Sequence, residues 1–221
     1  MPKISINEQA GEVSIIENTP KQPKCCLMLA HGAGAGMDHY FMEDLANALV
    51  NQGVLVVRFN FPYKEHGKKL PGSPKPNIAT IAKVADWCST QYAGLPFFLA
   101  GKSYGGRMSS HFLAEFSPKN INGIIYYGFP LHAPGKPDTQ RAQHLHSLKY
   151  PQLFIQGSND KLATIELIRE LVGNHKMAQL AEVPYADHSF KIMKKHQSID
   201  TKPINHRLAV ISKNWIDLQI S

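Results

Sequence analysis

A serine set among glycines stands near the middle of the sequence. The segment Gly101-Lys102-Ser103-Tyr104-Gly105-Gly106 follows the apolar run Phe97 to Ala100 and precedes a segment with helical periodicity. It fits the G-x-S-x-G pattern of a nucleophile elbow, a sharp strand-to-helix turn in which residues two before and two after the serine must be small. The free N–H groups of the following helix stabilise an oxyanion there. Ser103 is therefore the predicted nucleophile, and the Tyr104 N–H is one predicted oxyanion donor.

A serine oxygen needs a neighbouring base, and that base needs an acceptor to fix its tautomer. Asp160 ends the segment Gly157-Ser158-Asn159-Asp160, which follows the apolar run Leu153 to Gln156. His188 lies in Ala186-Asp187-His188-Ser189-Phe190, which follows the last predicted strand, Gln179 to Val183. The chain order Ser, Asp, His is the order found in α/β-hydrolases. We predict that His188 is the general base and that Asp160 orients it. Asp187 is interpreted as a helix cap without a catalytic role.

A second glycine-rich turn, Ala30-His31-Gly32-Ala33-Gly34-Ala35-Gly36, follows the apolar run Cys25 to Ala30. The corresponding loop of α/β-hydrolases supplies the other oxyanion donor. The N–H of Ala33 or of Gly34 is the predicted donor. The alternative is a flexible glycine turn ahead of a helix.

Short β-rich runs alternate with longer helical patterns, which predicts βα units and a mostly parallel sheet with helices on both faces. The whole chain, 1–221, is expected to form a single domain without a large cap, with a sheet of about seven to eight strands. The predicted strands are Ile4 to Asn7, Val13 to Ile16, Cys25 to Ala30, Val54 to Phe59, Phe97 to Ala100, Ile124 to Tyr127, Leu153 to Gln156 and Gln179 to Val183, the first two as an antiparallel edge hairpin. The predicted helices are Asp38 to Asn51, Asn77 to Tyr92, Gly105 to Phe116, Ala163 to Val172, Ser189 to His196 and Ile204 to Leu218, with Asp38 and Asn77 as caps.

Two stretches rich in proline, Pro62 to Pro76 and Pro130 to Leu148, do not fit this alternation and are expected to be long functional loops. The second stretch follows the strand after the elbow strand. Its Lys136 and Arg141 are therefore hypothesised to border the substrate pocket, and an anionic substrate stays possible.

Composition excludes several classes of protein. The chain is 43% hydrophobic and 19% charged, which is typical of a globular protein and not of a disordered one. The net charge is +7, but the basic residues have no stacking aromatic residues interleaved among them. We therefore expect neither a nucleic-acid nor a membrane partner. No signal-peptide core or membrane span is recognisable, which favours a cytoplasmic protein. The three cysteines imply no disulfide framework.

Competing motifs fail on single positions. A phosphate-binding P-loop ending at Ser103 needs a glycine where Pro96 stands, and a dinucleotide-binding loop needs one where Met37 stands. His132, His144 and His146 have no accompanying carboxylate or cysteine cluster, so no metal site is predicted. No cofactor is expected.

Four segments resemble the small α/β-hydrolases related to testis-expressed protein 30. They are His31 to Asp38, Arg58 to Tyr63, Gly101 to Arg107 and Asp187 to Phe190. The resemblance implies an α/β-hydrolase fold and hydrolase activity, although some relatives serve as scaffolds. The chain is also similar in size to dienelactone hydrolases, which use cysteine where this chain has Ser103, so dienelactone chemistry is not expected.

Together these features predict a serine hydrolase that cleaves an ester or thioester of a small acyl substrate through an acyl-enzyme. The alternative is a non-catalytic interaction scaffold built on the same fold. Oligomeric state is left open.

Overall fold

Eight strands form one sheet in the computed structural model, which describes residues 1–8, 10–193 and 203–220. Across the sheet the order is β1-β2-β4-β3-β5-β6-β7-β8. Strands β3 to β8 run parallel, whereas β2 is antiparallel to both β1 and β4. The predicted mostly parallel sheet and its antiparallel edge hairpin are confirmed. The strands are β1 (Lys3–Asn7), β2 (Gly11–Asn18), β3 (Cys25–Ala30), β4 (Val54–Phe59), β5 (Phe97–Lys102), β6 (Gly123–Tyr127), β7 (Gln152–Gly157) and β8 (Ala178–Val183).

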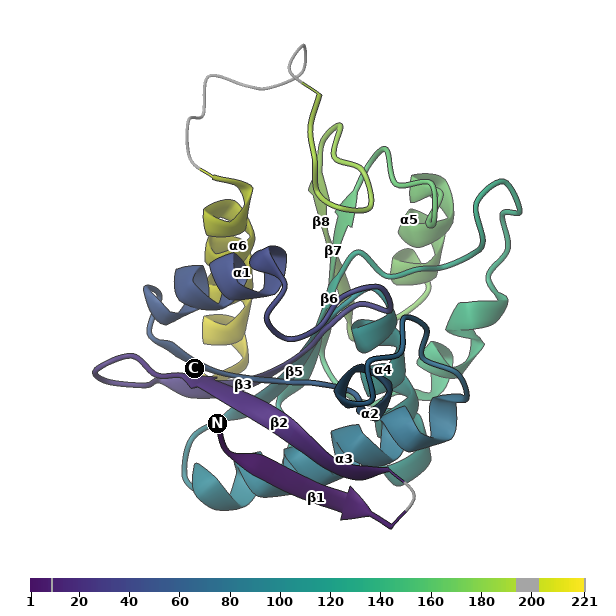
Figure 1. Cartoon of the computed structure of the whole chain (residues 1–221). Coiled ribbons are helices and arrows are strands. Elements are labelled where there is room, and N and C mark those ends of the chain that lie inside the picture. Colours follow the sequence, from purple (N-terminus) through teal and green to yellow (C-terminus); the bar gives the residue numbers. More distant parts are fainter. Residues whose placement is uncertain (9, 194–202, 221) are drawn as a thin grey trace.

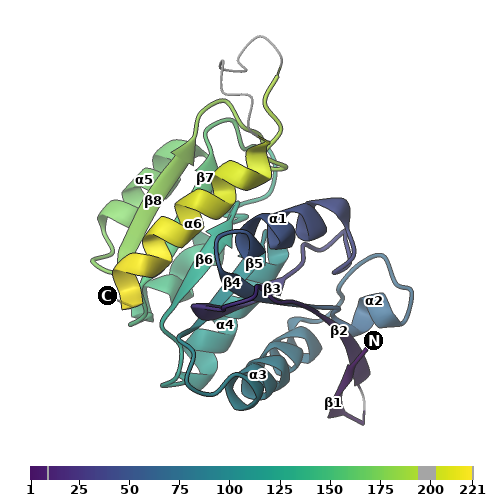
Figure 2. The same cartoon turned by 90° about the vertical axis from the view of Figure 1, so that its left-hand side faces the viewer.

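Helices cover both faces of the sheet (Figures 1 and 2). On one face α1 (Tyr40–Val50) and α6 (Ile204–Ile220) lie side by side, and on the other lie α3 (Pro74–Gln91), α4 (Tyr104–Phe116) and α5 (Ile165–Gly173). Each face has its own hydrophobic core, because the central strands alternate their side chains between the two. On β3, Leu27 and Leu29 belong to the α1 and α6 core, and Met28 belongs to the α3 and α4 core.

Register brings the carboxyl ends of the parallel strands to one edge of the sheet. Ala30 at the end of β3 is opposite Gly101 of β5, and Gly157 at the end of β7 is opposite Val183 of β8. The segments that follow these strands contain the predicted nucleophile, acid, base and oxyanion loop. The fold therefore places all four in one region, as open α/β sheets do at the ends of their strands.

Two predicted helix caps are wrong. Helix α1 begins at Tyr40 and has His39 as its N-cap, whose Nδ1 accepts a hydrogen bond from the Phe41 N–H at 3.3 Å. Helix α3 begins at Pro74, because a proline is well suited to the first helical position, where no N–H is needed. Asn77 therefore lies inside the first turn, and its side chain donates to the Ser73 carbonyl at 3.2 Å and to the Tyr104 hydroxyl at 2.8 Å.

The two proline-rich stretches contain short helices as well as loops. Helix α2 (Pro62–Glu65) opens the first stretch, with Pro62 in its first turn, and the 3₁₀ helix η1 (Gln140–Ser147) closes the second. No helix in the described ranges is both long enough and apolar enough to cross a bilayer.

Candidate active site

Ser103 stands on a strained turn between β5 and α4. Its backbone has φ 51° and ψ −114°, a region that L-residues rarely adopt, and its N–H donates to the Tyr127 carbonyl at 3.1 Å. A Cβ added to Gly101 would lie 2.1 Å from the Gly106 nitrogen, and one added to Gly105 would lie 2.4 Å from the Ala30 carbonyl oxygen. Both glycines are thus required by close backbone approach, as the elbow pattern implies.

The three residues predicted as a triad lie in one hydrogen-bonded chain. His188 Nε2 is 2.8 Å from Ser103 Oγ, and His188 Nδ1 is 2.7 Å from Asp160 Oδ2. These distances fit an imidazole that carries its proton on Nδ1 and accepts the serine hydroxyl proton on Nε2. The Asp160 side chain is completely buried, whereas that of His188 is 23% exposed. The His188 side chain is therefore accessible from the surface, whereas the Asp160 side chain is not.

Further donors hold the Asp160 carboxylate in place. Gln156, at the end of β7, donates from Nε2 to Asp160 Oδ2 at 2.6 Å and accepts the Phe129 N–H on its own Oε1 at 2.9 Å. The Leu162 N–H donates to Asp160 Oδ1 at 2.7 Å. A buried carboxyl group without hydrogen-bond partners is costly, and both oxygens of Asp160 have such partners.

The segment around His188 is a tight turn and not the start of the predicted helix. Asp187 Oδ1 accepts the N–H groups of Ser189 at 2.8 Å and Lys191 at 2.9 Å, and Phe190 has a left-handed φ of 61°. The predicted helix is thus absent over 189–193, and 194–196 lie outside the described residues. Asp187 caps this turn, and within the described residues its carboxylate makes no hydrogen bond to the triad.

Lys102, beside the nucleophile, ties the base to the elbow. Its Nζ donates to the His188 carbonyl at 2.7 Å and lies 5.5 Å from the Phe190 ring centre and 5.9 Å from that of Phe41. Burial lowers the pKa of Lys102 to about 8, although the Asp160 and Asp187 carboxylates act in the opposite direction. The amine is therefore a buried cation at neutral pH, held by one carbonyl and two aromatic faces.

The glycine-rich turn after β3 is fixed from behind by two side chains. His31 Nδ1 lies 2.8 Å from the Gly32 carbonyl oxygen, while its Nε2 accepts the Phe61 N–H at 3.1 Å. Burial lowers the pKa of His31 to about 4, so the ring is neutral and carries its proton on Nδ1. The Tyr63 hydroxyl donates to the Ala33 carbonyl at 2.9 Å.

These contacts decide where the next N–H groups point. In a planar trans peptide the C=O and the N–H point in opposite directions. Since the Gly32 and Ala33 carbonyls face His31 and Tyr63, the Ala33 and Gly34 N–H groups face away from them. In the described part of the chain neither N–H has a hydrogen-bond acceptor, so both are free to bind one.

A cavity of about 400 Å³ opens beside Ser103 on the α1 side of the sheet. No residue of 130–148 lines it, so Lys136 and Arg141 do not border this cavity. Its lining is mainly apolar and consists of Gly32, Ala33, Gly34, Ala35, His39, Tyr40, Phe41, Met42, Lys102, Ser103, Leu162, His188 and Ser189.

Sequence reasoning missed the residues that support the site. Lys102 occupies a variable position of the elbow pattern, and Gln156 and Tyr63 reach the site from separate elements. Position alone gave a signal for Lys102 and Gln156, because each stands at the carboxyl end of a parallel strand. Tyr63 gave none.

Across the described ranges, no three His, Cys, Asp or Glu side chains are grouped so as to hold a metal ion. His132 Nε2 instead accepts the Thr164 N–H at 2.9 Å, and His144 stacks on His111. The three cysteines are buried free thiols.

Comparison with known proteins identifies the family and the fold. A family model described as an alpha/beta hydrolase domain matches residues 23–217. Among solved structures, an alpha-beta serine hydrolase homologue from Coxiella burnetii has a TM-score of 0.73 at 17% identity, with 100% of this chain and 97% of that chain covered.

Two further solved structures are similar. A dienelactone hydrolase from Anabaena variabilis has a TM-score of 0.76 at 18% identity, over 97% of this chain and 94% of that one. Est1E from Butyrivibrio proteoclasticus, solved with ferulic acid, has a TM-score of 0.75 at 14% identity, over 100% and 99%. At these identities the structures establish the shared fold, and the match to the family model over most of the sequence establishes that this chain belongs to the alpha/beta hydrolase domain family.

Proposed function

We propose that the protein is a serine hydrolase that cleaves an ester or thioester of a small acyl substrate. The observation that carries the proposal is the unbroken chain of contacts from Ser103 Oγ through His188 to Asp160. A scaffold protein has no need for this chain on a strained backbone, since strain is retained where the surrounding structure and the function require it. The similarity to an alpha-beta serine hydrolase homologue supports the same reaction class.

In the proposed reaction Ser103 Oγ attacks the acyl carbonyl carbon while His188 Nε2 takes the hydroxyl proton. The carbonyl oxygen becomes an oxyanion, which the Tyr104 N–H and the N–H of Ala33 or Gly34 bind. His188 then gives its proton to the departing alcohol or thiol, which leaves an acyl-enzyme. Water repeats the sequence and releases the acid. Asp160 holds the ring orientation and stabilises its charged form throughout.

The cavity beside Ser103 suits the acyl group. Its volume is at the lower end of the range for small-molecule sites, and Phe41, Met42 and Leu162 make its wall apolar. We infer that acyl chains of short to medium length are preferred over charged or bulky ones.

A fluorophosphonate probe tests the nucleophile, because it labels activated serines. We expect one adduct in the intact-protein mass of the wild type and none in Ser103→Ala, which also loses at least ~10³-fold in ester turnover. Ser189→Ala is the matched control for labelling, since Ser189 lines the same cavity, and it should still be labelled. A wild-type protein without an adduct, or an adduct retained by Ser103→Ala, would contradict the proposal.

A further inference from the structure

Arg107 lies one helical turn beyond Ser103, and no carboxylate in the described part of the chain pairs with it. Its N–H donates to the Ser103 carbonyl at 3.1 Å, as the first turn of α4 requires. The Nε of its side chain is fully buried, and in the described residues it has no hydrogen-bond acceptor. No carboxylate in the described residues forms an ion pair with the Arg107 guanidinium either. A buried guanidinium donor without an acceptor is costly, which makes this position unusual.

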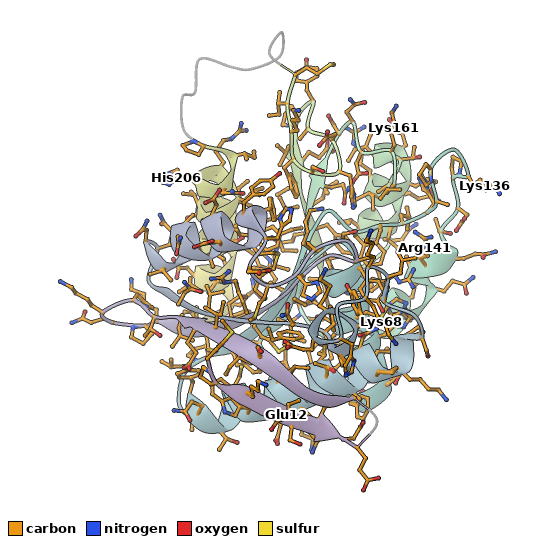
Figure 3. All side chains as sticks on the ribbon, in the orientation of Figure 1. Glu12, Lys68, Lys136, Arg141, Lys161 and His206 are labelled. Carbon is orange, nitrogen blue, oxygen red and sulfur yellow. The ribbon has the colours of Figure 1, made fainter. Side chains whose placement is uncertain are left out.

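A second guanidinium lies close enough to the first to act on its charge. Arg141 of η1 is anchored by its Nη1, which donates to the His132 carbonyl at 3.1 Å and to the Pro130 carbonyl at 3.4 Å. Burial and then the charge of Arg141 lower the pKa of Arg107, while Tyr104 acts in the opposite direction. Figure 3 shows Arg141 on the segment between β6 and β7, in the same half of the view as Lys68 and Lys136.

The packing of η1 on α4 brings together the two helices that contain these arginines. His144 stacks on His111 with ring centres 3.8 Å apart, and its Nε2 is 2.7 Å from Ser110 Oγ. Burial, with His111 and Arg107 as further causes, lowers the pKa of His144 to about 3, and burial also lowers that of His111. Both imidazoles are therefore neutral at pH 7, and the positive charge here comes from the two arginines.

Two guanidinium groups held together without a carboxylate repel each other, and an anion between them reverses the sign of that interaction. The planar fork of arginine matches a carboxylate or phosphate with paired hydrogen bonds. We propose that Arg107 and Arg141 form a binding site for an anionic carboxylate or phosphate group on the leaving-group portion of the substrate. The substrate part of this inference rests on the proposed hydrolase function.

The position of the pair relative to Ser103 supports the leaving-group assignment. The cavity for the acyl group is on the α1 face of the sheet, whereas α4 and η1 are on the opposite face with Tyr104. One turn of helix advances about 5.4 Å, which is close to the span of an aromatic ring. We therefore expect Arg107 to reach an anion on the far side of a phenyl leaving group.

Binding of inorganic phosphate, measured by isothermal titration calorimetry, tests the site without catalysis. We expect a dissociation constant on the order of 1 mM in the wild type, from two charge-assisted contacts, and at least tenfold weaker binding in Arg107→Gln and Arg141→Gln. Lys119→Gln is the control, because this exposed lysine follows the other end of α4 and its loss changes the net charge equally. No binding to the wild type, or equal binding to all four proteins, would overturn the site.

A matched pair of esters tests whether the anion belongs to the substrate. The anionic ester is 4-acetoxybenzoate, and the neutral one is 4-acetoxybenzamide. We expect Arg107→Gln and Arg141→Gln to raise KM about tenfold for the first and to leave the second unchanged. Equal effects on both esters would overturn the leaving-group assignment even if phosphate binds. A wild type that hydrolyses neither ester would contradict the proposed function, while the calorimetry still decides the anion site.

Discussion

The buried charge of Lys102 makes the stability of this protein depend on alkaline pH in a predictable way. An ordinary lysine has a pKa of 10.5, and burial lowers that of Lys102 to about 8. Between these values the unfolded chain keeps a proton that the folded chain has lost, so the free energy of unfolding rises with pH. The difference between the two pKa values corresponds to about 3 kcal/mol. Below pH 8 the folded state bears this cost in full.

Replacing Lys102 by methionine removes the titrating group and keeps a side chain of similar length. We expect the free energy of unfolding of the wild type to rise by about 3 kcal/mol relative to Lys102→Met between pH 8 and 10.5. Urea denaturation at half-unit steps of pH measures this difference. Buried tyrosines and cysteines titrate in both proteins, so their contributions cancel.

Lys83→Met is the control, because Lys83 is exposed on α3, and its pH dependence is expected to parallel the wild type. If the wild type and Lys102→Met follow parallel curves across this range, Lys102 is not a buried cation and the reasoning is refuted. A curve that falls relative to the variant would refute the sign.

Three further predictions follow from the same contacts. Because burial lowers the pKa of His31 from 6.5 to about 4, the free energy of unfolding should fall by about 3 kcal/mol as pH drops from 6.5 to 4, and His31→Gln should flatten that part of the curve in denaturation experiments. Tyr63→Phe frees the Ala33 carbonyl, and we expect about tenfold lower kcat with unchanged KM in steady-state kinetics, less than the loss of a whole oxyanion donor; a change in KM alone would count against this. Gly105→Ala places a Cβ 2.4 Å from the Ala30 carbonyl oxygen and should cost about 3 kcal/mol or more in thermal unfolding. Gly173→Ala meets no atom within 4 Å, so equal losses in the two variants would refute the steric account.

The fold could be predicted well from the sequence because its strands are nearly uninterrupted apolar runs. A strand buried on both faces, such as β3, has no exposed face that needs polar residues, so its apolar run is continuous and easy to recognise. Helix starts were harder to predict, because Asp38 and Asn77 are good caps by residue type, while His39 and Pro74 decide the actual starts. The expected helix after Ser189 is replaced by a turn, since Asp187 uses its carboxylate to bind two N–H groups within that turn.

The residues of the site likewise include some that the sequence predicts and some that it does not. Ser103, Asp160 and His188 could be placed together because each follows a parallel strand, and such strands end at one edge. The residues that support the triad could not be predicted, because their effect depends on contacts between distant segments. Lys102 reaches a carbonyl 86 positions away, and Gln156 joins the Phe129 N–H to the Asp160 carboxylate. Spacing along the chain carries no record of such contacts.

Ser103 follows the carboxyl end of β5, between the two faces of the sheet, and this position affects how substrate specificity can change. Lys102 before it belongs to the α1 face and Tyr104 after it belongs to the α4 face, with the full thickness of the sheet between their surroundings. Substitutions at Met42 on one side and at Arg141 on the other share no partner, so their effects on free energy should add. Acyl preference and leaving-group preference can then diverge as two independent traits, each by single steps that leave the other intact.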